Sequence, residues 1–163
     1  MRRGMSRRAL VSTIVLAIAL AVAPAHAGKK SVVSARIGGK KLAGSGRLAF
    51  ASYNAPILIV SGTVRRGRTV RTIALGCILL PPPTQFPYQC DGNSNYQEVV
   101  TKRPPVVKGW GTVHGMHLTI ERFDATRVVG SFAGAYDFGN ANNGQSLAPI
   151  SVEGGRFDVA FRH

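Results

Sequence analysis

The segment ISVEGGRFDVAF, residues 150–161, carries the residue pattern that decides the fold class. Phe157, Val159 and Phe161 alternate with polar or small residues, as expected where side chains point to the two faces of a β-strand in turn. The glycine pair before them is typical of a turn between two strands. The segment therefore predicts a closing β-hairpin with its turn at residues 153–156.

The same two-residue period recurs along the chain, whereas apolar residues at helical spacing never continue for the length of a helix. Eighteen glycines and eight prolines follow residue 27, and this composition disfavours helices. Strands are expected near residues 32–37, 48–52, 57–64, 70–76, 96–101, 109–113, 116–120 and 128–136. Short strands separated by glycine-containing turns predict an all-β domain, an antiparallel β-sandwich or barrel of about eight to ten strands.

Residues 1–27 have the layout of a signal peptide, which we expect to be helical and to direct export. Four arginines precede the mostly apolar stretch Ala9–Val22, and small residues lead to a cleavage position between Ala27 and Gly28. As a helix, the apolar stretch would extend about 21 Å, short of the roughly 30 Å of a bilayer core, so cleavage is favoured over a transmembrane anchor. The segment Ser6–Val11 also fits a twin-arginine signal, and the export route stays open.

The remainder, residues 28–163, is long enough for one domain and contains two cysteines, Cys77 and Cys90. An exported protein enters the periplasm or the extracellular space, where disulfides form, and two cysteines allow one intramolecular bridge. We expect a Cys77–Cys90 disulfide that closes a loop of about 14 residues, worth about 3 kcal/mol in a flexible chain. A metal site built on these cysteines would need further ligands, and no histidine lies near them in the sequence.

Positive charge is concentrated in the first part of this domain. Four of the 21 basic residues belong to the expected signal peptide, and the other 17 exceed the seven acidic residues by ten. Residues 28–90 contain ten of these basic residues and no acidic one. This asymmetry favours an anionic partner, for example an anionic envelope polymer or polysaccharide, although a basic surface can also serve solubility alone.

The densest charges are Arg65, Arg66, Arg68 and Arg71, around a predicted turn between two strands. Guanidinium groups bind phosphate or carboxylate through paired hydrogen bonds, so these four arginines are candidates for anion binding. The aromatic residues of a nucleic-acid platform are missing around them, and no specific nucleic acid is expected. A solvated tip that hinders edge-to-edge strand pairing is the competing interpretation.

His114 and His117 are weak candidates for a metal site. The sequence HGMH suits a two-residue hairpin turn that would place the two imidazoles opposite each other. Two ligands are too few for a tight site, and the sequence places no carboxylate beside them. Motifs of a catalytic nucleophile are missing, so neither an enzyme nor a cofactor is expected; a small hydrolase or metal-dependent enzyme with an unrecognised site is the alternative.

Two stretches carry a family resemblance: GTVHGMHLTIERFDATRVVGSFAGAYDF, residues 111–138, and the closing segment at residues 150–161. They are similar to the closing hairpins of small exported bacterial β-sandwich domains, often lipoproteins, whose function is not known. The shared residues belong to turns and core, so the resemblance implies a fold and no catalytic or binding residue. We expect a non-catalytic exported binding or envelope-associated β-domain with a basic surface for an anionic partner, of unspecified oligomeric state.

Overall fold

The computed structural model describes residues 29–80 and 83–162, and the expected signal peptide, with Ala27 and Gly28, lies outside them. Eleven strands and one 3₁₀ turn make up the described chain: β1 (Val32–Ile37), β2 (Lys40–Ser45), η1 (Gly46–Leu48), β3 (Ala49–Asn54), β4 (Ile57–Arg66), β5 (Thr69–Ile78), β6 (Tyr88–Val100), β7 (Val106–Phe123), β8 (Arg127–Tyr136), β9 (Phe138–Ala141), β10 (Ser146–Leu147) and β11 (Ile150–Ala160). None of the residues described forms a helix long and apolar enough to cross a membrane.

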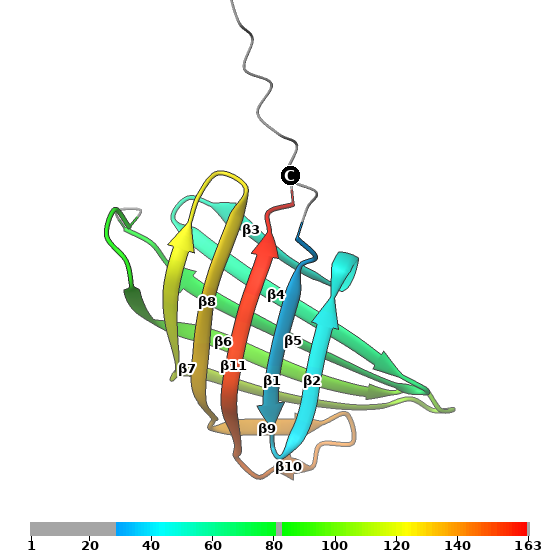
Figure 1. Ribbon diagram of the computed structural model, residues 1–163. Helices are drawn as coiled ribbons and strands as arrows, with labels where there is room; N and C mark the ends of the chain where they lie inside the picture. The colour runs from blue at the N-terminus through cyan, green and yellow to red at the C-terminus, as the bar shows by residue number, and fades with distance from the viewer. Residues whose placement is uncertain (1–28, 81–82, 163) are drawn as a thin grey trace, which may run out of the picture.

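The strands form an antiparallel sheet that nearly closes into a barrel. Nine strands follow the order β2-β1-β11-β8-β7-β6-β5-β4-β3, while β9 pairs with β7 and β10 with β9. In Figure 1, β1, β2, β8 and β11 cross in front of β4, β5 and β6. At one end the outermost strand β3 meets the chain after β11, where Ala51 and Phe161 form a parallel bridge. The expectation of an antiparallel all-β domain is confirmed.

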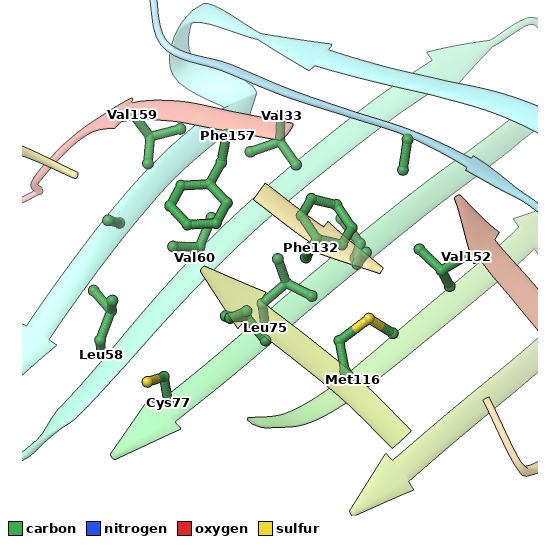
Figure 2. Packing of buried hydrophobic residues seen from close by; sticks show 14 of the residues in the cluster. Val33, Leu58, Val60, Leu75, Cys77, Met116, Phe132, Val152, Phe157 and Val159 are labelled. Atoms are coloured by element: carbon green, nitrogen blue, oxygen red, sulfur yellow. The ribbon is translucent and has the colours of Figure 1, made fainter. Parts of the chain in front are cut away.

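The core fills the space between the two layers of the sheet because alternate residues of each strand point inward. On β4, Leu58 and Val60 are buried while Ile57 and Ile59 are exposed. Figure 2 shows side chains from both layers meeting in one cluster, which includes Val33, Leu58, Val60, Leu75, Cys77, Met116, Phe132, Val152, Phe157 and Val159. Side chains thus occupy the interior, as in other small barrels.

Two glycines let the opposite ends of the sheet approach each other. A Cβ on Gly62 of β4 would lie 2.6 Å from Cβ of Val33 on β1, and a Cβ on Gly44 of β2 would lie 2.7 Å from the carbonyl oxygen of Thr63. Both distances are well below van der Waals contact, so any side chain at either position would push β1 and β2 away from β4. These glycines therefore permit the near closure.

The predicted hairpin turn at residues 153–156 is wrong, because β11 continues through it. The register with β8 passes from Val152 opposite Gly134 to Gly155 opposite Phe132, which leaves an extra residue on β11. Such a β-bulge shifts the alternation by one residue. Val152 and Phe157, an odd number of residues apart, consequently both face the core.

The predicted turn at residues 114–117 is also wrong, since these residues lie within β7. The register with β6 passes from Ser94 opposite Thr112 to Gly92 opposite Met116, so β7 contains a bulge with two extra residues here. Thr112 Oγ1 anchors the bulge by accepting the Gly115 N–H at 2.7 Å and donating to Asp137 Oδ2 at 2.7 Å. Before the bulge β7 pairs with β9, and after it with β8.

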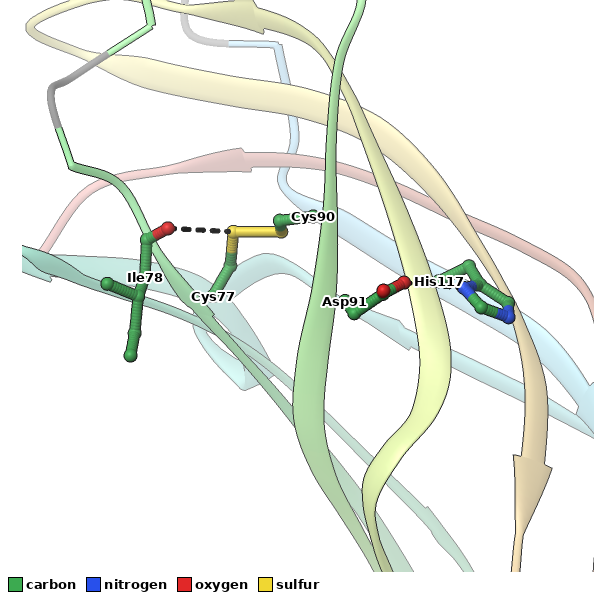
Figure 3. The surroundings of a disulfide bond; sticks show 5 residues. All are labelled: Cys77, Ile78, Cys90, Asp91 and His117. Carbon is green, nitrogen blue, oxygen red and sulfur yellow. Dashed lines mark hydrogen bonds and ion pairs between the residues drawn. A yellow bond between two sulfur atoms is a disulfide. The ribbon is translucent and has the colours of Figure 1, made fainter.

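The expected disulfide is confirmed. Cys77 at the end of β5 and Cys90 near the start of β6 are joined by an S–S bond of 2.01 Å, with their Cα atoms 6.3 Å apart (Figure 3). The bridge closes the connection between β5 and β6, and both sulfurs belong to the apolar cluster or its margin. It links two strands that already pair with each other along residues 69–76 of β5.

We expect Gly62→Ala to lower the free energy of unfolding by about 1–3 kcal/mol, because the new methyl group overpacks the contact with Val33. Gly109→Ala is the matched control, since nothing lies within 4 Å of the corresponding Cβ position. Denaturant unfolding measures both variants. Equal effects of the two glycine substitutions would contradict the close approach.

We expect the double variant Cys77→Ala/Cys90→Ala to lose somewhat less than about 3 kcal/mol of unfolding free energy, because Pro83 and Pro87 already restrict the unfolded loop. Denaturant unfolding with and without reductant tests this. Reductant should destabilise the wild-type protein by a similar amount and leave the double variant unchanged; an effect of reductant on the double variant would show that the loss has another source.

Candidate functional site

Three of the four arginines singled out from the sequence lie at an exposed hairpin tip. Arg65 and Arg66 end β4 and Arg68 precedes β5, and all three side chains are exposed. Within the part of the chain that the structure describes, none of the three has a carboxylate within the 4.0 Å of a salt bridge. Their guanidinium groups are therefore available to an external anion.

A second loop adds two cations to this tip. Thr101, which follows β6, donates its backbone N–H and its hydroxyl to the carbonyl oxygen of Arg68, at 2.8 and 3.0 Å. Lys102 and Arg103 come directly after Thr101 and are exposed. Figure 1 shows the β4–β5 and β6–β7 connections projecting together at the right of the view. We call Arg65, Arg66, Arg68, Lys102 and Arg103 the basic tip.

Lys102 and Arg103 were missed from the sequence because they lie more than 30 residues beyond the arginine cluster. The pairing of β5 with β6 brings the two segments together. Thr69 at the start of β5 lies opposite Val100 at the end of β6, so the residues just before β5 and just after β6 meet at the same end of the sheet. That inference needs the register of the two strands, which a single sequence does not provide.

Arg71 does not belong to the exposed cluster, which corrects its assignment as an anion-binding candidate. It lies opposite Glu98 of β6, on the same face of the sheet as the buried Ile73. Its Nε donates to Glu98 Oε2 at 2.9 Å, and only 18% of its side chain is exposed. An arginine with its carboxylate already in place has little capacity for another anion.

Glu98 is the centre of this inward-facing charge cluster. Its Oε2 also lies 3.5 Å from Lys40 Nζ at the start of β2, and Tyr96 donates its hydroxyl to the same atom at 3.4 Å. Burial alone would raise the pKa of Glu98, but the hydrogen bond from Arg71 and the charges of Lys40 and Arg71 outweigh it, and the net shift is downward. Burial, followed by the charge of Glu98, raises the pKa of Tyr96 to about 12. The carboxylate thus neutralises cations of the barrel end and leaves those of the basic tip uncompensated.

No turn separates the two histidines, because residues 114–117 lie within β7. His117 lies opposite Asp91 of β6 and its Nδ1 is 2.7 Å from Asp91 Oδ1 (Figure 3), with 72% and 64% of the two side chains exposed. The side chain of His114 lies outside the described residues. Among the residues described, no three His, Cys, Asp or Glu side chains are grouped as metal ligands. The contact fixes one ring nitrogen of His117 and leaves Nε2 for another partner.

An apolar groove of about 520 Å³ runs over the outer face of β4, β5 and β6, near the disulfide. Ile57, Ile59 and Ile78 line it with Val113, and all four are exposed. Asp91, Asn93 and Asn95 lie on its polar side. The groove bears no cation of the basic tip, so the two surfaces are chemically separate.

We expect Glu98→Gln to lower the free energy of unfolding by about 1–3 kcal/mol near pH 7, because Arg71 and Lys40 then lack a carboxylate. The folded-state pKa of Glu98 lies below its unfolded value of about 4.3, so its contribution is complete above that value and is lost as the pH falls through the folded-state pKa. Denaturant unfolding at a series of pH values should show the difference between wild type and variant shrinking in acid. The exposed Glu121→Gln is the control, and a pH-independent difference would contradict the ion pairs.

Comparisons with known proteins assign no family to this chain. No family model matches it, and no match is found among curated proteins or solved structures. The resemblance to small exported bacterial β-domains accordingly stays a prediction. The function has to be inferred from the residues of the site itself.

Proposed function

We propose that this protein is a non-catalytic, exported binding module whose basic tip holds an anionic polymer of the cell envelope. The observation that carries the proposal is the basic tip itself: five exposed cations from two loops, with no carboxylate within salt-bridge distance of the three arginines among the residues described. Concentrating like charges without compensation raises the energy of the free protein, and an anionic partner removes that repulsion.

The backbone contact between the two loops supports binding rather than a merely solvated tip. The paired hydrogen bonds from Thr101 to the Arg68 carbonyl hold the loops together, so the cations are presented as one group. Preorganised charges lose less conformational freedom on binding than independent side chains do. Three of the five are arginines, whose planar groups fit phosphate and carboxylate oxygens in pairs.

The shape of the site favours a polymer over a small ligand. The cations are exposed at strand ends and in loops, where they can meet successive charges along a polymer. The Cys77–Cys90 disulfide is typical of proteins in oxidising compartments, which supports an exported location for such an encounter.

We expect the protein to bind long-chain polyphosphate or polygalacturonate at about 50 mM salt and to lose most of this binding by about 200 mM, because the contacts are made by exposed charges. The triple variant Arg65→Gln/Arg66→Gln/Arg68→Gln should bind about tenfold or more weakly, and the slope of log affinity against log salt should fall by about two. Equilibrium binding with labelled polymer measures both quantities.

The matched control is Lys30→Gln/Arg47→Gln/Arg156→Gln, which removes three exposed cations away from the tip. It should retain most of the affinity because it leaves the basic tip intact. Equal losses in the two triple variants would mean that net charge alone attracts the polymer and would overturn the proposal. Binding of neutral dextran with equal affinity would overturn it as well.

A further inference from the structure

A cavity of about 280 Å³ lies at the opposite end of the barrel from the basic tip. Its lining comes from the end of β3, the β7–β8 turn and the residues after β11: Tyr53, Phe123, Asp124, Ala125, Phe161 and Arg162. Tyr53 pairs with Leu58 at the beginning of β4, whereas the tip residue Arg66 ends that strand. From Leu58 to Arg66 the strand advances eight residues, about 26 Å, which is the approximate separation of the two sites.

Three aromatic rings form the walls of this cavity. The Tyr53 and Phe123 rings meet edge to face with centroids 5.2 Å apart, and Phe123 meets Phe161 in the same manner at 5.5 Å. The backbone N–H of Phe161 donates to the Thr126 carbonyl oxygen at 3.0 Å, which holds the last ring against the β7–β8 turn. All three rings are half-buried, so apolar surface faces the cavity.

The hydroxyl of Tyr53 is not explained by the fold. Its Oη is buried and has no hydrogen-bond partner among the residues that the structure describes. A buried hydroxyl without a partner costs about 1–3 kcal/mol, a cost that a phenylalanine at this position would avoid. Because Oη has almost no solvent-accessible surface, the Tyr53 hydroxyl lies behind the wall of the cavity and supplies no hydrogen bond to a ligand within it.

The charges at the rim favour an anion over a cation. Asp124 Oδ1 accepts the backbone N–H groups of Thr126 and Arg127 at 2.8 and 2.9 Å, and its Oδ2 lies 3.2 Å from Arg122 Nε. Arg162 stacks over the Phe50 ring at 4.2 Å. No carboxylate of the described chain lies within salt-bridge distance of Arg162. The carboxylate of the rim is thus engaged, while the guanidinium retains donors for a ligand.

We propose that this cavity binds a small amphiphilic anion, an aromatic or short aliphatic carboxylate, with its apolar body against the Phe123 and Phe161 rings and its carboxylate on Arg162. The volume is roughly twice that of a 150 Å³ cavity that accommodates benzene, so a molecule of two fused rings fits. An organic cation is repelled by Arg162, and a neutral molecule gains the apolar contacts without the charged hydrogen bond.

The test uses 2-naphthoate as the probe, with 2-naphthylmethanol and 2-naphthylmethylammonium as the neutral and cationic analogues. Titration of the ¹⁵N-labelled protein by NMR should show naphthoate shifting the amides of residues 123–125 and 161–162. Naphthoate should bind about tenfold more tightly than the neutral analogue, and the cation should bind more weakly than either, as expected for one charge-assisted contact.

Two variants separate the apolar from the charged contribution. Arg162→Gln should weaken the binding of 2-naphthoate about tenfold and leave the affinity for the neutral analogue unchanged. Ala125→Phe should weaken the binding of both ligands, because the new phenyl ring would occupy the cavity. The denaturation midpoint of this variant shows whether its fold is intact. Arg47→Gln, an exposed arginine elsewhere, should change nothing.

Three outcomes would overturn the assignment. One is unchanged naphthoate affinity in Arg162→Gln; another is an equal loss in Arg47→Gln, which would indicate general attraction to a basic protein. The third is a set of shifted amides confined to the outer groove around Ile57, Ile59 and Ile78 or to the basic tip. Because the polymer experiment uses other residues and other ligands, failure of either proposal leaves the other standing.

Discussion

The near closure of the barrel depends on the contact of β1 and β2 with β4, where Val33 fills the space above Gly62 and the backbone of Thr63 lies against Gly44. A sheet of nine strands has two edges, and unpaired edges favour association with other chains. Here β1 and β2 cover the part of β4 that extends beyond β3, and the Ala51–Phe161 bridge joins the other end. Without a glycine at these contacts, the two edges would remain apart and open the core to water.

Once the sheet has curved in this way, its interior is filled by the side chains of its own strands. Side chains in the interiors of small barrels generally pack at close to crystal density. Both sites that we infer lie instead at the ends, where strands stop and loops begin. Loops on a rigid strand framework are common positions for binding residues, because the strands fix their ends while their side chains vary freely.

The distribution of charge follows from the same architecture. Near one end, the half-buried Arg71 and the exposed Lys40 converge on the carboxylate of Glu98. Cations in the loops beyond that end have no such acidic neighbour among the residues described, and they form the basic tip. At the other end, aromatic side chains of β3, β7 and the chain after β11 close the core. The two ends thus differ in chemistry: one is cationic and exposed, and the other is apolar with a charged rim.

The sequence by itself determined the elements that depend on local pattern. The two-residue alternation identified most strands, the two cysteines allowed one bridge, and the run of arginines at a turn marked an exposed tip. Each of these features follows from neighbours in the chain: side-chain direction alternates in any strand, and a glycine between charged residues favours a turn.

Only the tertiary structure decided which strands pair and in which register. The glycines at residues 154 and 155 form a bulge instead of a turn because both Val152 and Phe157 can be buried only if an extra residue lies between them. The pairing of β5 with β6 places Arg71 opposite Glu98 and brings Lys102 next to the arginines of the basic tip. A one-residue change of register would send every side chain to the opposite face, so the composition of a site on a sheet is a property of non-local pairing.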